Sequence, residues 1–364
     1  MANKLPIPAH TLCQALSQLH GLENLSPGEL VALPATGTAH GHVRVLRRID
    51  GRWPLARICY AHKGDEGAAA RLSTQATAFE RAAPAAATPH LLGVVPPCEG
   101  VPGGILLVEF IAGGAPKLPD DLPSIAAALA RLHDLPTPAP ERIAPMTQAE
   151  HPVMALLQAI EINAPFIERL SLSAQSRAML ADELNYARHF ATRHGSEPAV
   201  LTFALADTHP GNFLLDRAGK IWFVDLEKAH YGSPAIDLAH ATLPTSTLWD
   251  PSQNVVLSRA QTVAFYRAYG ALAPERMGRL RPVLTPLRRM TWLRTMAFMA
   301  RWKVQTALPY DGNDPSQWSD SGLMPEMRLH IAGAIERAFQ PAAIAQTRHE
   351  WLGPEPLDLS ALNY

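Results

Sequence analysis

Short apolar runs and one helical run make up a β-rich unit in the first third of the chain. Strand-length runs bounded by turn residues such as Asp50-Gly51 are typical of β-strands. The stretch 66–83 is rich in Ala, Gln, Glu and Arg and contains no proline, which predicts a helix. The strand runs are 30–33, 42–49 and 55–61 before this helix, and 91–95 and 104–111 after it. This order predicts a mostly antiparallel sheet with one helix, rather than alternating βαβ units.

Apolar residues at three- and four-residue spacing predict helices over most of the remaining chain. A small β patch at 200–215 and 221–224 interrupts this pattern, and Pro354 and Pro356 exclude a helix near the end. The predicted helices are 122–135, 153–164, 173–194, 259–270, 287–304 and 324–339. Because Gly113-Gly114 separates the two patterns, we predict an α+β protein with two lobes. Its parts are a small β lobe with an N-terminal helical extension at 1–112, a large helical lobe at 113–352, and a tail at 353–364.

Composition and charge restrict the classes of protein to consider. A length of 364 residues is long for one core, and 47% hydrophobic with 18% charged residues is typical of a globular protein. A formal net charge of -1 provides no general attraction to nucleic acid or to anionic lipid. No stretch approaches the ~18 continuous apolar residues of a membrane span, and the N-terminus lacks the pattern of a secretory signal. Three widely separated cysteines predict neither a disulfide framework nor a metal site. We therefore expect a cytoplasmic protein without nucleic-acid or membrane partners; no oligomeric state is specified by these features.

The residues that predict chemistry lie in the β patch of the large lobe. Asp207 precedes Asn212 by five positions, and Asp225 directly follows the apolar strand 221–224. In phosphoryl transfer a carboxylate accepts the proton of the attacking hydroxyl, while an amide oxygen and another carboxylate hold the Mg²⁺ that bridges the phosphates. A short loop between two strands presents such groups from one backbone. The pattern predicts Asp207 as the catalytic base, with Asn212 and Asp225 as metal ligands.

The same stretch carries a resemblance to a known family. Asp-Thr-His-Pro-Gly-Asn at 207–212 is followed by Val-Asp-Leu-Glu at 224–227 and Gly-Ser-Pro-Ala-Ile-Asp-Leu-Ala at 232–239. This block resembles the signature of the aminoglycoside phosphotransferase family, which shares a protein-kinase-like fold with choline and ethanolamine kinases. Residues 106–113 are similar to the hinge strand of that family, and residues 127–133 to the first helix of its larger lobe. The resemblance extends over about residues 30–302.

The resemblance implies a bilobal protein-kinase-like fold and an ATP- and Mg²⁺-dependent kinase that phosphorylates a hydroxyl of a small molecule. The small lobe would bind the nucleotide. The implied contacts are Gly37 in the glycine loop, Arg57 on the third strand, Glu80 on the helix, and Glu109 and Ile111 in the hinge.

Arg57 stands where the family has its phosphate-anchoring lysine. Side chains alternate along a strand, so Arg57, Cys59 and Ala61 share one face. Lys63 follows the expected end of the strand. We therefore expect Arg57, rather than Lys63, to hold the phosphates.

Two departures from the family leave a second interpretation open. Leu205-Ala206 replaces the usual His-Gly before the catalytic aspartate, and the planar guanidinium of Arg57 is not equivalent to an ammonium group. The alternative is a catalytically inactive kinase-fold protein that binds a nucleotide or a partner. The complete set of Asp207, Asn212 and Asp225 favours the enzyme. A metal-dependent hydrolase using His209 would need a second histidine at ligand spacing, which the sequence lacks.

Several residues near this block have two interpretations. Glu227 either adds a metal or substrate contact or is a solvated carboxylate. Glu80 either pairs with Arg57 or lies on the helix surface. We expect Asp237 to cap a helix or to bind the backbone of the catalytic loop, and His133 to have a core or surface role.

The charge of one predicted helical region bears on the acceptor. Residues 276–303 include eight basic and no acidic side chains: Arg276, Arg279, Arg281, Arg288, Arg289, Arg294, Arg301 and Lys303. A polycationic aminoglycoside would need a pocket lined with carboxylates, so we expect a neutral or anionic acceptor. The acidic residues that would oppose this expectation by reaching the pocket are Asp250, Asp311, Asp314 and Asp320.

Overall fold

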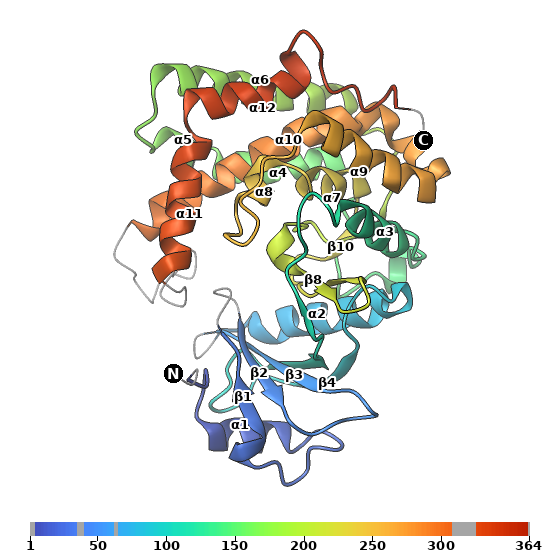
Figure 1. The fold of residues 1–364 in the computed structure, drawn as a ribbon, viewed down its shortest axis with the longest axis vertical. Helices are drawn as coiled ribbons and strands as arrows, with labels where there is room; N and C mark the ends of the chain where they lie inside the picture. Colours follow the sequence, from blue (N-terminus) through green and yellow to red (C-terminus); the bar gives the residue numbers. More distant parts are fainter. Residues whose placement is uncertain (1–3, 35–39, 62–64, 308–324, 363–364) are drawn as a thin grey trace.

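The N-terminal part of the chain is built on a five-stranded antiparallel sheet. The structure, a computed structural model, describes residues 4–34, 40–61, 65–307 and 325–362. The sheet has the order β1-β2-β3-β5-β4. Its strands are β1 (Leu30–Ala32), β2 (His40–Val45), β3 (Pro54–Cys59), β4 (Leu91–Val95) and β5 (Ile105–Glu109). Helices α1 (Ala9–Leu16) and α2 (Ala68–Ala82) lie on its opposite faces (Figure 1).

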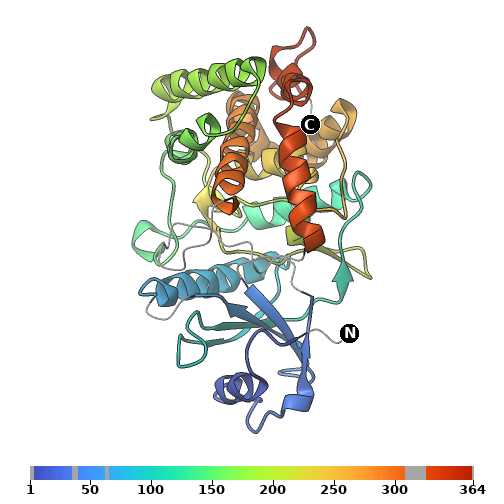
Figure 2. The same cartoon turned by 90° about the vertical axis from the view of Figure 1, so that its left-hand side faces the viewer.

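Strand β5 shows why this sheet is covered on both faces. Ile105 and Leu107 pack in a cluster that contains Leu12 and Leu16 of α1. Leu106 and Val108 instead belong to the larger cluster, which contains the α2 residues Leu72, Ala76 and Phe79. Because successive side chains of a strand point to opposite faces, a continuous apolar run requires cover on both sides. Figure 2 shows α2 between the sheet and the helical part of the molecule.

The rest of the chain is mostly helical, with two small sheets. One sheet has the order β6-β8-β9, and in the other β7 pairs with β10. These strands are β6 (Gly113–Gly114), β7 (Thr202–Ala204), β8 (Phe213–Asp216), β9 (Ile221–Phe223) and β10 (His230–Gly232). The first helices are α3 (Leu122–His133), α4 (Pro152–Asn163), α5 (Pro165–Glu168), α6 (Ala174–His194) and α7 (Pro234–His240). The later ones are α8 (Pro244–Thr247), α9 (Arg259–Leu272), α10 (Pro274–Thr306), α11 (Pro325–Ala338) and α12 (Pro341–Leu352).

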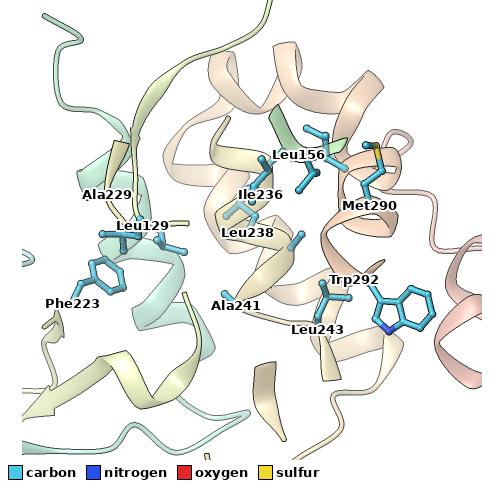
Figure 3. Close-up of a cluster of buried hydrophobic side chains, with 14 of the residues drawn as sticks. Leu129, Leu156, Phe223, Ala229, Ile236, Leu238, Ala241, Leu243, Met290 and Trp292 are labelled. Carbon is cyan, nitrogen blue, oxygen red and sulfur yellow. The ribbon is translucent and has the colours of Figure 1, made fainter. Parts of the chain in front are cut away.

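Helix α10 runs through the middle of the helical part and packs against α4, α6, α7 and α9. Figure 3 shows part of this core, with side chains of α7 and α10 that are all buried. They include Ile236, Leu238, Met290 and Trp292. Each such side chain contributes about 1.5–3 kcal/mol by burial, so the helices that position the catalytic loop form a rigid base.

The predicted order of three strands, one helix and two strands is confirmed, as is the α+β fold. The start of α10 was predicted wrongly, because the helix begins at Pro274 and continues through Pro282 and Pro286. Each proline removes one backbone hydrogen bond, but the buried Leu280 and Leu284 keep this segment packed. We did not predict β10 or α12 either. The lobe boundary at 112/113 stays a prediction.

The described helices include none that is both long and apolar enough to cross a membrane, α10 with its 33 residues included.

Candidate active site

Asp207 lies in a loop that follows β7, and a buried carboxylate binds the backbone of this loop. Asp237, in the first turn of α7, accepts hydrogen bonds from the backbone N–H groups of Leu205 (2.7 Å) and Ala206 (2.8 Å). Its Oδ2 also lies 3.1 Å from Nε2 of His133. Burial raises the pKa of Asp237, but these contacts outweigh it and hold the pKa below the usual range. Asp237 thus braces the catalytic-loop backbone, one of the two roles that the sequence predicted, and His133 has a core role.

Ala206, the residue before Asp207, has a left-handed backbone with φ of 59°. This conformation is strained for residues with a Cβ and favours glycine. The expected family pattern has glycine at this position. Hydrogen bonds on two sides keep the backbone in this conformation. Asp237 accepts from the N–H of Ala206, and the NH2 group of Arg294 donates to the carbonyl of Ala206 at 3.1 Å.

Asn212 is oriented by the loop itself. Its Nδ2 donates to the backbone carbonyl of Asp207 at 2.9 Å, which leaves Oδ1 available as an acceptor. The carbonyl of Asn212 accepts from the N–H of Val224 at 3.0 Å. The catalytic loop is therefore tied to the residue that precedes Asp225. Main-chain bonding thus brings together the three residues that the sequence predicted for catalysis and metal binding.

Arg57 of β3 pairs with Asp225. Its NH2 lies 2.9 Å from Oδ1 of Asp225, and its NH1 donates to the carbonyl of Val224. The Arg57 side chain is only 3% exposed. Burial raises the pKa of Asp225, but the neighbouring guanidinium outweighs burial and holds this pKa below its usual range. A residue of the β-rich part thus bonds directly to the proposed metal carboxylate.

Lys228 stands beside Asp207. Its Nζ lies 2.5 Å from Oδ2 of Asp207 and 4.0 Å from Oε1 of Glu227. Burial raises the pKa of Asp207, but the ammonium group of Lys228 beside it outweighs burial, so this pKa lies well below the usual range. Asp207 is therefore ionised at neutral pH, as a proton acceptor must be. Lys228 was not predicted from the sequence.

Glu227 lies beside Asp225 and near His40. A ligand atom of each of the three lies within 4.8 Å of the other two. Burial, with the charge of Asp225, raises the pKa of Glu227 to about 7, whereas burial lowers that of His40 to about 3. Two adjacent carboxylates and a neutral imidazole fit a divalent cation, whose charge would remove the repulsion between the carboxylates. Of the two interpretations of Glu227, this geometry supports the metal contact.

Aromatic side chains border Asp207 on the side of α10. The Nζ of Lys228 lies 5.7 Å from the ring centre of Phe298. Trp249 lies edge-on to Phe298 and to Trp302, with ring centres 6.1 and 6.5 Å apart. These rings form an aromatic group beside Lys228, the ion-pair partner of Asp207.

Only some of the residues of the β-rich part that were predicted to bind the nucleotide lie at this site. A cavity of about 470 Å³ is lined by His40, Cys59, Gln75, Glu227 and Lys228, among others. Several residues of α2 line this cavity, among them the buried Gln75, but Glu80 does not.

Glu80 is exposed, and in the described part of the chain the ion pair of Arg57 is with Asp225. Of the two interpretations of Glu80, the pairing with Arg57 is therefore wrong, and the helix-surface position is confirmed. Helical geometry explains the error: Glu80 is five positions from Gln75, which turns it by about 140° to another face. Gly37 and Lys63 lie outside the described residues.

Of the predicted hinge residues, Glu109 is the last residue of β5 and Ile111 lies just after this strand. The carboxylate of Glu109 pairs with Arg52 at 3.6 Å, and its N–H donates to the carbonyl of His90 at 2.8 Å. Ile111 is half-buried and lies just before β6. Nucleotide contacts of Glu109 and Ile111 stay predictions.

A comparison with models of protein families identifies the family of this chain. The model of the phosphotransferase enzyme family matches residues 36–277, more than half of the chain. The chain belongs to the phosphotransferase enzyme family. No curated protein matches the sequence of this phosphotransferase at a significant level.

Solved structures of phosphotransferases share its fold. A choline kinase from Cryptosporidium parvum Iowa II has a TM-score of 0.59 at 10% identity, covering 96% of this chain and 99% of its own. A spectinomycin phosphotransferase solved with ADP and spectinomycin has a TM-score of 0.59 at 13% identity, covering 94% and 97%. A macrolide 2'-phosphotransferase from Brachybacterium faecium has a TM-score of 0.56 at 15% identity, covering 89% and 97%. These similarities establish the protein-kinase-like fold of the phosphotransferase.

The basic run of α10 has a different role from the one expected. Four of its side chains pair with carboxylates of other helices or loops: Arg276 with Asp134, Arg288 with Glu350, Arg289 with Glu183, and Lys303 with Glu336. These pairs hold the helical part of the phosphotransferase together and contribute no net charge to a pocket. Arg294 differs from these four, because its side chain reaches the catalytic loop at the carbonyl of Ala206.

One of the acidic residues that would oppose an anionic acceptor lies near the loop. A methyl group added at Gly211 would come within 2.6 Å of Oδ2 of Asp250. Asp311, Asp314 and Asp320 lie outside the described residues.

Three site residues were not predicted from the sequence: Lys228, His40 and Gln75. Lys228 carried a usable signal, because it follows the Val-Asp-Leu-Glu motif at once. No sequence signal marked His40 or Gln75, because these residues reach the site only through the packing of β2 and α2 in the β-rich part.

Proposed function

We propose that this phosphotransferase transfers the γ-phosphoryl group of ATP, with Mg²⁺, to a hydroxyl of a small molecule. The observation that carries the proposal is the bonding of the Asp207 loop to the Asp225 strand through Asn212. It holds Asp207 and Asp225 in one rigid unit, which supports their roles as proton acceptor and metal ligand in phosphoryl transfer. We also propose that the boundary between the two lobes lies at 112/113 and that the residues from 353 onward form a tail.

Asn212, Asp225 and Glu227 would hold Mg²⁺. When bound, the ion neutralises charge on the phosphates. Arg57 would then turn from Asp225 toward the α- and β-phosphates, because the cation replaces it as the partner of that carboxylate. Glu109 and Ile111 would contact the base of the nucleotide from the hinge, and Gly37 the phosphates.

Asp207 would accept the proton of the acceptor hydroxyl as its oxygen attacks phosphorus. In the structure its carboxylate is held by Lys228. We propose that Lys228 turns to the transferring phosphoryl group, which carries more negative charge than the carboxylate. This movement frees Asp207 for the hydroxyl and places a cation where charge develops.

The acceptor is proposed to be a neutral or anionic hydroxyl compound with an apolar face. Lys228 and Arg294 are two cations beside Asp207, and Phe298, Trp249 and Trp302 supply aromatic surface. The paired arginines of α10 give no further support. The carboxylate of Asp250, near Gly211 in the loop, counts against an anionic acceptor.

A second candidate function is an inactive kinase-fold protein that binds a nucleotide or a partner. Its support is that both functional carboxylates, Asp207 and Asp225, are neutralised by cations of the chain itself. An enzyme must exchange these partners during turnover, whereas a binding protein keeps them.

An ADP-release screen tests the proposal. The protein is incubated with Mg·ATP or Mg·GTP and with amino alcohols, sugars, aminoglycosides, macrolides and hydroxy amino acids, and Asp207→Asn is the matched blank. Acceptor-dependent release of ADP from ATP, or of GDP from GTP, that is lost in this variant supports the kinase. Thermal stabilisation by ATP regardless of Mg²⁺, with no release above the blank for any acceptor, supports the binding protein instead. Efficient turnover of kanamycin-like compounds, with none of neutral or acidic alcohols, would overturn the acceptor class alone.

A further inference from the structure

Arg294 of α10 is a cation at the catalytic loop that has no anionic partner. Its NH2 group donates to the carbonyl of Ala206, the residue before Asp207, at 3.1 Å. Among the residues that the structure describes, its guanidinium makes this one hydrogen bond and no ion pair. Burial lowers the pKa of Arg294, but a guanidinium stays charged at neutral pH. The charge of Arg294 therefore lacks a counter-ion.

Two nitrogens of this guanidinium are accessible to solvent. Nε and NH1 have no hydrogen-bond partner in the described part of the chain, yet neither is a buried unpaired atom, and the residue is only half-buried. The neighbouring residues Leu293, Thr295 and Met296 are buried. Solvent therefore reaches Arg294 from the face of α10 that meets the catalytic loop, where a small molecule could also reach it.

The same face of α10 lies beside the ion pair of the catalytic base. Phe298 follows Arg294 by four residues, about one helical turn, so the two side chains share a face. The ring centre of Phe298 lies 5.7 Å from Nζ of Lys228, which pairs with Asp207. Burial and the charge of Arg294 lower the pKa of His240, whose Nε2 lies 4.0 Å from Oδ1 of Asp207. Arg294 therefore belongs to the group of side chains around the base.

The other two cations of the site already have a carboxylate. Lys228 pairs with Asp207, and Arg57 pairs with Asp225. A charged group that is partly removed from water without an anion loses hydration that nothing replaces. Of these three cations, only Arg294 would gain an ion pair from an anionic ligand without first breaking one.

We propose that Arg294 binds an anionic group of the acceptor, so that this phosphotransferase acts on a hydroxyl compound that carries a carboxylate or a phosphate. The inference rests on the proposed phosphoryl transfer and narrows its acceptor class. Arginine forms short, charge-assisted hydrogen bonds with both kinds of group. Phe298, one turn along α10, would contact the apolar part of the same molecule.

Pairs of hydroxyl compounds, each an acid and its neutral counterpart, test the proposal. They are 4-(hydroxymethyl)benzoate with its amide, 4-hydroxybutanoate with its amide, and glycerol 3-phosphate with glycerol. Calorimetric titrations in Mg²⁺ and a non-hydrolysable ATP analogue, which keeps the acids from the nucleotide side, measure their affinities. The native protein should bind at least one acid about tenfold or more tightly than its neutral counterpart, which is the value of a hydrogen bond to a charged group. The pair with the largest ratio identifies carboxylate or phosphate as the preferred group.

Arg294→Gln keeps an N–H donor on the side chain but removes the charge. It should abolish the preference for the acid, while the neutral counterpart binds as before. Arg279→Gln is the matched control, because it makes the same change at an exposed residue of α10 and should leave the preference intact. If Arg294 only supports the loop, the affinities for acid and neutral counterpart should fall together, and their ratio should stay constant.

A second measurement uses the native protein and stays decisive if Arg294→Gln does not fold. Phenylglyoxal modifies accessible arginines, and peptide mass spectrometry reports the modification at each position. Modification of Arg294 should be lost when the preferred acid is saturating and should persist with its neutral counterpart. Arg279 should be modified equally in both cases.

Four results would overturn the proposal. No acid binds the native protein more tightly than its neutral counterpart up to the solubility limit; or the preference persists in Arg294→Gln; or Arg279→Gln reduces it as much; or phenylglyoxal fails to modify Arg294, or modifies it despite the acid. ADP release from ATP with the same compounds keeps this inference separate from the proposed function. A preference for acids without phosphorylation would contradict the kinase alone, whereas phosphorylation of neutral compounds without a preference would contradict the role of Arg294 alone.

Discussion

The ammonium nitrogen of Lys228 lies 2.5 Å from Oδ2 of Asp207, although the sequence places the two residues 21 positions apart. A second pair, Arg57 with Asp225, repeats this arrangement at 2.9 Å. In both ion pairs a basic side chain of the protein neutralises a carboxylate that we propose to interact with the substrates. The site therefore keeps its charges balanced before a substrate enters, and each substrate must replace an internal partner.

Asp207→Asn is expected to abolish acceptor phosphorylation while nucleotide binding survives, because Asp207 orients the hydroxyl and not the nucleotide. A general base contributes about 10²–10⁴-fold to the rate. Steady-state ADP release and a thermal-shift titration with Mg·ATP measure the two properties. Retention of more than about a tenth of the rate would contradict the assignment of the base.

Lys228→Met is expected to lower kcat by about 10²-fold, because the variant lacks the cation proposed to stabilise the transferring phosphoryl group. The KM for the acceptor should change much less. The control is Lys303→Met, the same change at a side chain that pairs with Glu336 on α11. If Lys228→Met raises KM and leaves kcat intact, Lys228 binds the acceptor and takes no part in the transfer.

Asp225→Ala is expected to remove the Mg²⁺ dependence of nucleotide binding and to destabilise the fold. The second effect arises because Arg57, only 3% exposed, loses its charge partner, at a cost of up to about 3 kcal/mol. Adding Arg57→Met should recover part of the stability without restoring Mg²⁺ binding. Urea unfolding and titrations with and without Mg²⁺ separate the two effects. Equal Mg·ATP affinity in Asp225→Ala and the native protein would contradict the metal assignment.

Glu227 predicts a pH dependence of stability in the absence of metal. Its pKa in the folded protein is raised from 4.5 to about 7, so between these values the folded state binds the proton more tightly than the unfolded state. The free energy of unfolding should therefore fall as pH rises from 4.5 to 7, by the order of 2 kcal/mol. Glu227→Gln should reduce this slope. Mg²⁺ should also oppose the loss, because it competes with the proton; a slope unaffected by either change would count against the shared cation site.

Ala206→Gly is expected to stabilise the protein by about 1 kcal/mol. Glycine adopts the left-handed conformation, with φ of 59°, without the clash that alanine has there. Thermal or urea unfolding of the two proteins measures the difference. Ala204→Gly, in the strand β7, is a matched control and should be destabilising. A loss of stability in Ala206→Gly would mean that the left-handed backbone carries no strain.

Much of the catalytic block could be predicted because its information is local. The offset between Asp207 and Asn212 lies within one loop, and Asp225 comes two residues after β9, which pairs with the preceding strand β8 of the same hairpin. Residues so close along the chain have few alternative arrangements. The antiparallel β unit was predictable for the same reason, since its strands are short apolar runs separated by turns.

The errors arise where distant packing outweighs local preference. The sequence predicted a helix only from residue 287, yet buried leucines keep the proline-containing segment before it helical. Glu80 has the residue type expected of the α2 contact, but the rotation of the helix presents Gln75 to the site. The basic run of α10 suggested a positive pocket, whereas several of its side chains pair with carboxylates of other elements.

The sequence by itself determined the chemistry of the reacting groups, because the motif 207–227 encodes both residue types and their spacing. Only the tertiary structure decided the electrostatics around them. Arg57 meets Asp225 across 168 positions, and Asp237 meets the loop across 31 or 32. Contacts at such separations depend on how sheets and helices pack, and the pKa of a carboxylate depends on which charges that packing places beside it.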